Sequence, residues 1–126
     1  MLFDSDVLIW HLRGNKSATT VINSQENLEI SVVNYMEVIQ GVRNKRELTA
    51  MRGFLKDLGF RMVPLTENIG SRAALYMEGY ALKTRLSLTD ALVAATAVET
   101  QSVLCSGNTK HYRLIEGLEL KQFRPS

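Results

Sequence analysis

The sequence predicts a three-layer α/β/α domain with a central, mostly parallel β-sheet. Short apolar segments of strand length alternate with longer segments of helical periodicity, and strands separated by helical crossovers pair in parallel. The short segments lack strict alternation of polar and apolar residues, which is typical of strands covered by helices on both faces. The chain has 126 residues, enough to bury one core, so we expect a single domain over 1–126.

Five segments have the length and composition of strands. The first is a short apolar run that ends at Asp4. The second is rich in β-branched residues, and the third is ended by Pro64. The predicted strands are 2–3, 28–33, 60–65, 103–105 and 118–123.

The segments between these strands have helical periodicity and helix-terminating residues. Asn34 and Thr66 are suited to cap the starts of helices, whereas Gly14 and Gly59 are suited to end them. The predicted helices cover 7–12, 17–25, 34–42, 48–58, 66–80 and 87–101.

Composition excludes several classes of protein. Apolar residues make up 45% of the chain and charged residues 22%, which excludes a disordered chain. A single cysteine, Cys105, excludes a disulfide scaffold, and no apolar run is long enough to span a membrane. The start of the chain lacks the features of a signal peptide, so we expect a cytoplasmic protein. The net charge of +2 permits an anionic partner without requiring one.

Four polar side chains are expected at the carboxyl edge of the sheet. Asp4 ends the first strand, and Asn108 follows the fourth. Glu37 and Asp90 are each expected in the first turn of a helix. Ligands of parallel sheets bind beyond the carboxyl ends of the strands, so we expect these four side chains to converge there.

Such a convergence of acids favours a bound cation. Two carboxylates about 5 Å apart repel each other by about 3 kcal/mol at an effective dielectric constant near 20. A cluster of three is therefore stable only if some protonate or a cation lies between them. Oxygen ligands favour Mg²⁺, or alternatively Mn²⁺, over Zn²⁺, and such an ion activates water toward a phosphodiester. The pattern thus predicts metal-dependent phosphodiester hydrolysis.

Helix capping is a simpler explanation for two of these acids. Residues 87–90 form a capping box and residues 34–37 resemble one, so Asp90 and Glu37 would each stabilise only a helix, by about 0.5–1 kcal/mol. Asp4 is expected to have no such role, because an acid directly after a buried strand is otherwise a cost. The sequence leaves capping and metal binding open, and the two are compatible.

Four motifs occur in order along nearly the whole chain. An apolar strand, an aspartate and small polar residues occupy 2–9, and a serine with a following glutamate occupies 31–37. The apolar helix start covers 88–97, and Ser-Gly-Asn-Thr-Lys-His-Tyr covers 106–112. Together they resemble the PIN-domain nucleases, more narrowly the VapC-like toxins of type II toxin–antitoxin systems.

The resemblance implies a PIN-like fold and an Mg²⁺-dependent endoribonuclease. It implies cleavage of RNA by a metal-activated water that leaves a 5′-phosphate. It also implies a cognate antitoxin, whose C-terminal segment lies in the groove and blocks the acidic site, and a homodimer.

Site residues follow by position in the motifs. Asp4 and Asp90 are implied as the principal metal ligands, with Glu37 as a third acid. Asn108 stands where the family often has a fourth acid, and an amide cannot supply the negative charge of a full second metal site. We expect Asn108 to hold a ligating water or to orient Asp4. Supporting roles are expected for three further residues, of which Asp6 is expected mainly to support the helix start: Ser5, Asp6 and Ser106.

Several other polar side chains lie near the expected site. Lys110, Arg113 and Arg85 are candidates for contacts with RNA phosphates, although surface cations without such a role are commoner. His111 follows the last motif, and we favour a plain surface histidine over an RNA contact.

Two other functions remain open from the sequence. Residues 3–6 resemble the Asp-x-Asp loop of haloacid dehalogenase phosphatases, with Asp4 as the nucleophile, although the later motifs of that family are absent. The other alternative is a catalytically inert PIN scaffold that binds RNA or an antitoxin. The three acids argue against this alternative, whereas Asn108 leaves it open.

Overall fold

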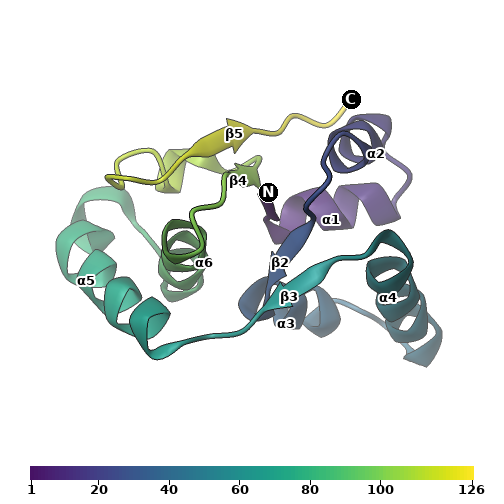
Figure 1. Ribbon diagram of the computed structural model, residues 1–126, viewed down its shortest axis with the longest axis horizontal. Helices are drawn as coiled ribbons and strands as arrows, with labels where there is room; N and C mark the ends of the chain where they lie inside the picture. Colours follow the sequence, from purple (N-terminus) through teal and green to yellow (C-terminus); the bar gives the residue numbers. More distant parts are fainter.

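Five parallel strands form one sheet at the centre of the molecule. The computed structural model describes residues 1–126, and its strand order is β3-β2-β1-β4-β5 (Figure 1). Every neighbouring pair is parallel, which confirms and sharpens the predicted sheet. The strands are β1 (Leu2–Phe3), β2 (Glu29–Ser31), β3 (Arg61–Val63), β4 (Leu104–Ser106) and β5 (Leu120–Gln122).

Helices cover both faces of the sheet. Figure 1 shows α5 and α6 on one side and α1, α2 and α4 on the other. None of the helices combines the length and the apolar character needed to cross a membrane. Their bounds are α1 (Ser5–Leu12), α2 (Lys16–Asn23), α3 (Val32–Gln40), α4 (Lys45–Leu58), α5 (Glu67–Thr84), α6 (Leu88–Glu99) and the short 3₁₀ helix η1 (Thr109–His111).

The strands divide the apolar side chains between two cores. Successive residues of a strand point to opposite faces, so Leu2 and Leu104 pack among residues of α5 and α6. Phe3 and Cys105 point the other way and pack among residues of α1, α2 and α4. Because both faces of the sheet are buried, the strand sequences lack strict alternation of polar and apolar residues. The two cores confirm the predicted three-layer α/β/α class.

The start of α3 differs from the prediction. Val32 and Val33 suggested a longer strand, but β2 ends at Ser31, whose hydroxyl accepts a hydrogen bond from the backbone N–H of Asn34. Ser31 is therefore the N-cap residue, and the prediction that Asn34 caps this helix is wrong. Glu37 consequently lies in the second turn of α3, where it has no capping role.

The strand order places a switch point beside β1. The chain moves from β1 to β2 and β3 on one side, and β4 and β5 lie on the other. The carboxyl ends of β1 and β4 are therefore neighbours from which the connections diverge, and such a point is where open α/β sheets bind ligands. Asp4 follows β1 directly, and Ser106 ends β4.

Candidate active site

Asp4 forms the floor of the site at the end of β1. The residue is only 9% exposed, and four donors surround its carboxylate. Oδ1 accepts from the backbone N–H of Ser5 at 2.9 Å and from the amide of Asn34 at 2.9 Å. Oδ2 accepts from the hydroxyls of Ser106 at 2.8 Å and Tyr112 at 3.0 Å. Asp4 is also the N-cap residue of α1, so the prediction that it has no capping role is wrong.

Burial makes the charge of Asp4 costly. Removal from water raises its pKa from 3.8 to about 6, although its hydrogen bonds oppose the rise. No lysine or arginine forms an ion pair with it; its neighbours are neutral donors and Asp6, another acid. The carboxylate is thus held in place by hydrogen bonds that do not neutralise it.

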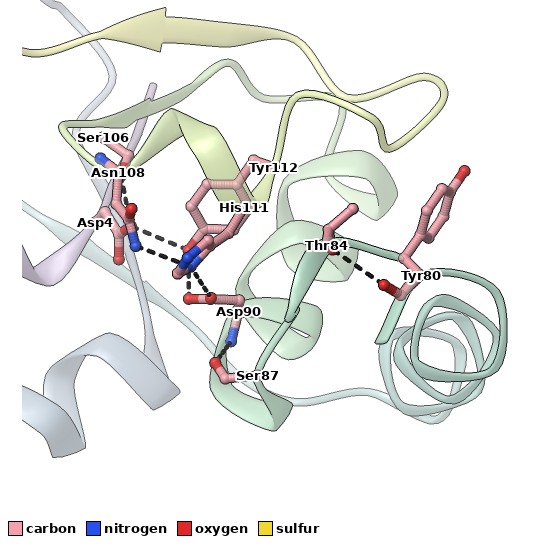
Figure 2. Close-up of polar contacts among 9 residues, drawn as sticks. All are labelled: Asp4, Tyr80, Thr84, Ser87, Asp90, Ser106, Asn108, His111 and Tyr112. Carbon is pink, nitrogen blue, oxygen red and sulfur yellow. Dashed lines mark hydrogen bonds and ion pairs between the residues drawn. The ribbon is translucent and has the colours of Figure 1, made fainter. Parts of the chain in front are cut away.

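Asp90 approaches Asp4 from the start of α6. Its backbone N–H donates to the Ser87 hydroxyl at 3.0 Å, which confirms Ser87 as the cap of α6. The Asp90 carboxylate makes no return bond to Ser87, so only half of the predicted capping box forms. This carboxylate is held by the residues around the end of η1: Oδ1 accepts from Tyr112 at 3.1 Å, and Oδ2 lies 3.1 Å from Nδ1 of His111. Figure 2 shows Tyr112 between the two aspartates. Asp4 and Asp90 therefore share one donor.

Glu37 lies at the rim of the site and is exposed. Oε1 accepts from the hydroxyl of Ser5 at 2.6 Å and from the amide of Asn34 at 3.0 Å. The amide of Asn34 also donates to Asp4, so Glu37 and Asp4 share a donor. The amide itself is oriented because its oxygen accepts from the Ser31 hydroxyl at 3.0 Å.

The site contains more acceptors than donors. The Tyr112 hydroxyl has one hydrogen but lies within 3.1 Å of two carboxylates. The Asn34 amide has two hydrogens but lies within 3.0 Å of three oxygen atoms. Acceptor oxygens left facing one another without a proton repel. The gathered oxygens therefore favour an additional positive charge, either a proton or a cation.

Asp6 connects the start of α1 to the loop after β4. Oδ1 accepts from the backbone N–H of Val7 at 2.8 Å, and Oδ2 accepts from that of Gly107 at 2.8 Å. Burial raises the pKa of Asp6, and these two hydrogen bonds oppose the rise. A Cβ atom at Gly107 would lie 2.6 Å from Oδ2 of Asp6, so this contact requires glycine. Both carboxylate oxygens of Asp6 accept hydrogen bonds from the backbone. Asp6 therefore supports the start of α1, as predicted, and also the loop after β4.

Asn108 does not contact Asp4 with its side chain. Its backbone N–H donates to the Ser106 hydroxyl at 3.0 Å, and that hydroxyl donates to Asp4. Its amide nitrogen lies 3.1 Å from Nδ1 of His111, the same nitrogen that faces Asp90. One ring nitrogen serves only one of these partners at a time. The interpretation of His111 as a plain surface histidine is wrong, because the ring reaches Asp90.

The three cations suggested for RNA contact lie outside this hydrogen-bonded network. Arg85, Lys110 and Arg113 are exposed, and none pairs with a carboxylate. Arg85 ends α5 with a left-handed backbone (φ 58°), which lets the next residue, Leu86, enter the core.

The oxygens present fit a small divalent ion that keeps much of its water. No three acidic, histidine or cysteine side chains form a ready-made cage for a metal. Mg²⁺ does not require one, because it commonly binds to one or two carboxylates and retains several waters. Asp4 and Asp90 supply two carboxylates around a shared donor, in a site with unmatched negative charge.

Besides His111, two residues of the site were not predicted as members of it. Asn34 was placed as a cap, although its spacing of three residues from Glu37 puts both on one helical face. Tyr112 belonged to the last motif, but an aromatic residue after a strand usually indicates core packing. Its ring is buried as that rule expects, and only the tertiary structure reveals where its hydroxyl points.

Comparison with known proteins assigns the family. The family model described as "PIN domain" matches residues 1–116. The chain belongs to the PIN domain family. The ribonuclease VapC10 of Mycobacterium tuberculosis is 37% identical over 123 residues, which cover 94% of this chain and 90% of the relative. This PIN domain is also 28% identical to the ribonuclease VapC19 of the same organism, over 94% of this chain and 96% of that protein.

Solved structures agree with this assignment. A toxin–antitoxin complex from Klebsiella pneumoniae has a chain 26% identical to this PIN domain, with a TM-score of 0.75 and 93% of each chain covered. DNA-bound VapBC from Salmonella typhimurium reaches a TM-score of 0.84 at 18% identity, with 96% of each chain covered, and so supports the fold alone. Membership of the PIN family replaces the alternative resemblance to haloacid dehalogenase phosphatases.

Proposed function

We propose that this PIN domain is a metal-dependent endoribonuclease of the VapC type, the toxin of a toxin–antitoxin pair. The observation that carries the proposal is the buried Asp4, which shares one donor with Asp90 and another with Glu37 and pairs with no lysine or arginine. The relatives named as ribonucleases support RNA as the substrate. Mg²⁺ is the proposed ion, with Mn²⁺ as a substitute.

Each acid has a different environment and therefore a different proposed role. Asp4 and Asp90 would hold the ion, because their oxygens converge on a single hydroxyl. Glu37 lies at the exposed rim, and its Oε2 accepts no hydrogen bond from the chain, so it is available to take a proton from an attacking water. When bound, a divalent ion supplies the positive charge that stabilises the phosphoryl oxygens and makes a nearby water more acidic.

The test is cleavage of a structured RNA by purified protein with Mg²⁺ or Mn²⁺. We expect D4N and D90N to reduce cleavage to background while the circular dichroism spectrum stays native. E37Q should slow cleavage substantially. The matched control is D57N, which makes the same change at an exposed position of α4 and should cut at the wild-type rate. Wild-type cleavage by D4N or D90N would remove that residue from the site, and an inactive wild-type chain would favour the inert scaffold.

An apolar groove supports the proposed antitoxin partner. A cavity of about 700 Å³ lies among α1, α3 and α4, close to the elements that carry Asp4 and Glu37. A partner helix with apolar residues on one face would fit it. L12D, at an exposed residue of the groove, should weaken capture of the co-expressed antitoxin without changing RNA cleavage. Six of the lining residues are apolar: Ile9, Leu12, Val38, Val42, Ala50 and Met51.

The outer face of α5 supports the proposed homodimer. Leu75 is 66% exposed and Leu82 is fully exposed, and between them Gly79 has open space where a side chain would lie. Exposed leucines on one helical face favour burial against a second copy. L82K should shift the mass measured by light scattering from dimer to monomer.

The exposed cations near the site support contact with RNA phosphates. K110Q, R113Q and R85Q together should weaken RNA binding and reduce its dependence on salt concentration. The control is K56Q on α4, which should leave the salt dependence unchanged.

A further inference from the structure

The hydroxyl of Tyr112 links the two aspartates on which the proposed function depends. It lies 3.0 Å from Oδ2 of Asp4 and 3.1 Å from Oδ1 of Asp90. These carboxylates belong to residues 86 positions apart, at the ends of different elements. The two carboxylates make no direct hydrogen bond to each other, and this hydroxyl is the only group of the chain that contacts both.

The position of the hydroxyl is fixed by the core. Tyr112 is 1% exposed and packs in the apolar cluster formed with α5 and α6. A buried aromatic ring has few alternative orientations, so the hydroxyl is held rigidly. Figure 2 shows the ring directed from the end of η1 toward both aspartates, whereas Tyr80 on α5 points away from them.

The other donors of the site act on one aspartate at a time. Ser106 donates to Asp4 alone, and His111 reaches Asp90 alone. Losing either contact would leave the other aspartate undisturbed. Losing the Tyr112 hydroxyl would remove a contact from both aspartates at once and would leave the two acids without a common partner, so that they repel each other.

We propose that Tyr112 is a positioning residue whose hydroxyl sets the spacing of the Asp4 and Asp90 carboxylates for a divalent ion. The inference rests on the proposed function, because it assumes that these two acids hold the ion. Groups that orient metal ligands typically change metal affinity by about 10–100-fold when they are removed. Tyr112 would therefore act through the two aspartates and not on the RNA.

The test is Y112F, which keeps the ring and removes only the hydroxyl. We expect Mn²⁺ binding, measured by calorimetry and by the electron paramagnetic resonance signal of free Mn²⁺, to weaken about ten-fold or more. RNA cleavage should then require about ten-fold more Mn²⁺ and return to near the wild-type rate at saturating ion. A structural defect elsewhere would lower the maximal rate without moving the Mn²⁺ midpoint.

Two variants sharpen the result. Y80F makes the same change at a hydroxyl outside the site and should bind Mn²⁺ like the wild type. S106A removes a donor to Asp4 alone and should have a smaller effect than Y112F. Unchanged or tighter Mn²⁺ binding by Y112F, or an effect no larger than that of S106A, would overturn the proposal. Failure of the wild type to bind Mn²⁺ or to cut RNA would instead count against the proposed function.

Discussion

The acids at the amino and carboxyl edges of the sheet lie in opposite electrostatic environments. At the amino edge, Glu29 forms an ion pair with Arg61 at 2.8 Å, lies 3.9 Å from the terminal ammonium of Met1 and accepts from the Ser102 hydroxyl at 2.5 Å. At the carboxyl edge, Asp4 has only neutral donors. Burial alone would raise the pKa of both acids, but the hydrogen bonds of Ser102 and Arg61 outweigh it and lower that of Glu29.

This difference separates a structural ion pair from the proposed catalytic site. A cavity of about 520 Å³ lies at the amino edge, and the acid among its lining residues that is most buried, Glu29, is already neutralised. At the carboxyl edge the negative charge is left unmatched, at a cost in stability, and that unmatched charge would attract a cation. Both edges hold an acid, and the uncompensated charge is what distinguishes the proposed reactive edge from the amino edge.

The largest effect on stability is expected from an extra negative charge at the carboxyl edge. N34D replaces a fully buried donor to Asp4 and Glu37 with an acid of nearly the same shape. We expect it to destabilise the metal-free fold by at least about 3 kcal/mol at pH 7, because a fourth carboxylate joins those of Asp4, Glu37 and Asp90. Urea denaturation measures the loss, and N68D, on the exposed first turn of α5, is the control. A loss no greater than that of N68D would contradict the electrostatic account.

Removing the charge of Asp4 should stabilise the metal-free protein, the opposite of the effect expected for N34D. Its pKa in the fold, about 6, lies above its ordinary value of 3.8, so the folded state binds the proton more tightly than the unfolded state does. Stability from this group is fully present below about pH 4 and is lost as the pH rises to about 6.

D4N should therefore stabilise the metal-free protein at pH 7 by up to about 3 kcal/mol relative to wild type, while abolishing cleavage. The two proteins should converge in stability near pH 4. Thermal denaturation with chelator at both pH values measures the difference. Equal stabilities at pH 7 would show that burial of this carboxylate carries no cost.

The amino edge should show loss of stability without loss of activity. E29Q removes the charge that Arg61 and the terminal ammonium neutralise, and we expect a loss of about 1–2 kcal/mol at pH 7. The loss should shrink as the pH falls, because a lowered pKa stabilises the fold only while the acid is ionised. RNA cleavage should match the wild type, and E78Q, at an exposed position, should change neither property. Reduced cleavage by folded E29Q would contradict the claim that the amino edge contributes only to stability.

The smallest effect concerns the loop that carries the last motif. G107A places a Cβ atom against Oδ2 of Asp6, and we expect it to destabilise the fold by about 1 kcal/mol. The double variant D6A/G107A should lose less than the sum of the single losses, because the clash disappears with the carboxylate. G53A has open space in α4 and should stabilise by about 0.5–1 kcal/mol. Additive losses in the double variant would rule out the Asp6–Gly107 contact as the cause.

Much of the fold could be predicted from local patterns. The short apolar runs give the five strands, and hydroxyl caps such as Ser87 and Thr66 give two helix starts that the structure confirms. The start of α3 could not be predicted correctly, because Val32 and Val33 favour a strand while Ser31 caps a helix, and local preference does not decide between them. Packing of Val33 into one core and Val38 into the other decides it.

The sequence by itself determined the parallel α/β class and the order in which the acids follow the strands, because both depend on patterns between near neighbours. Tertiary structure alone decided that Asn34 and Tyr112 would join those acids. A hydrogen bond depends on where a side chain ends in space, and the residues that Tyr112 joins are 108 and 22 positions away along the chain. No local pattern records such a meeting, because it arises only when the sheet brings β1, β4 and the start of α6 to one edge.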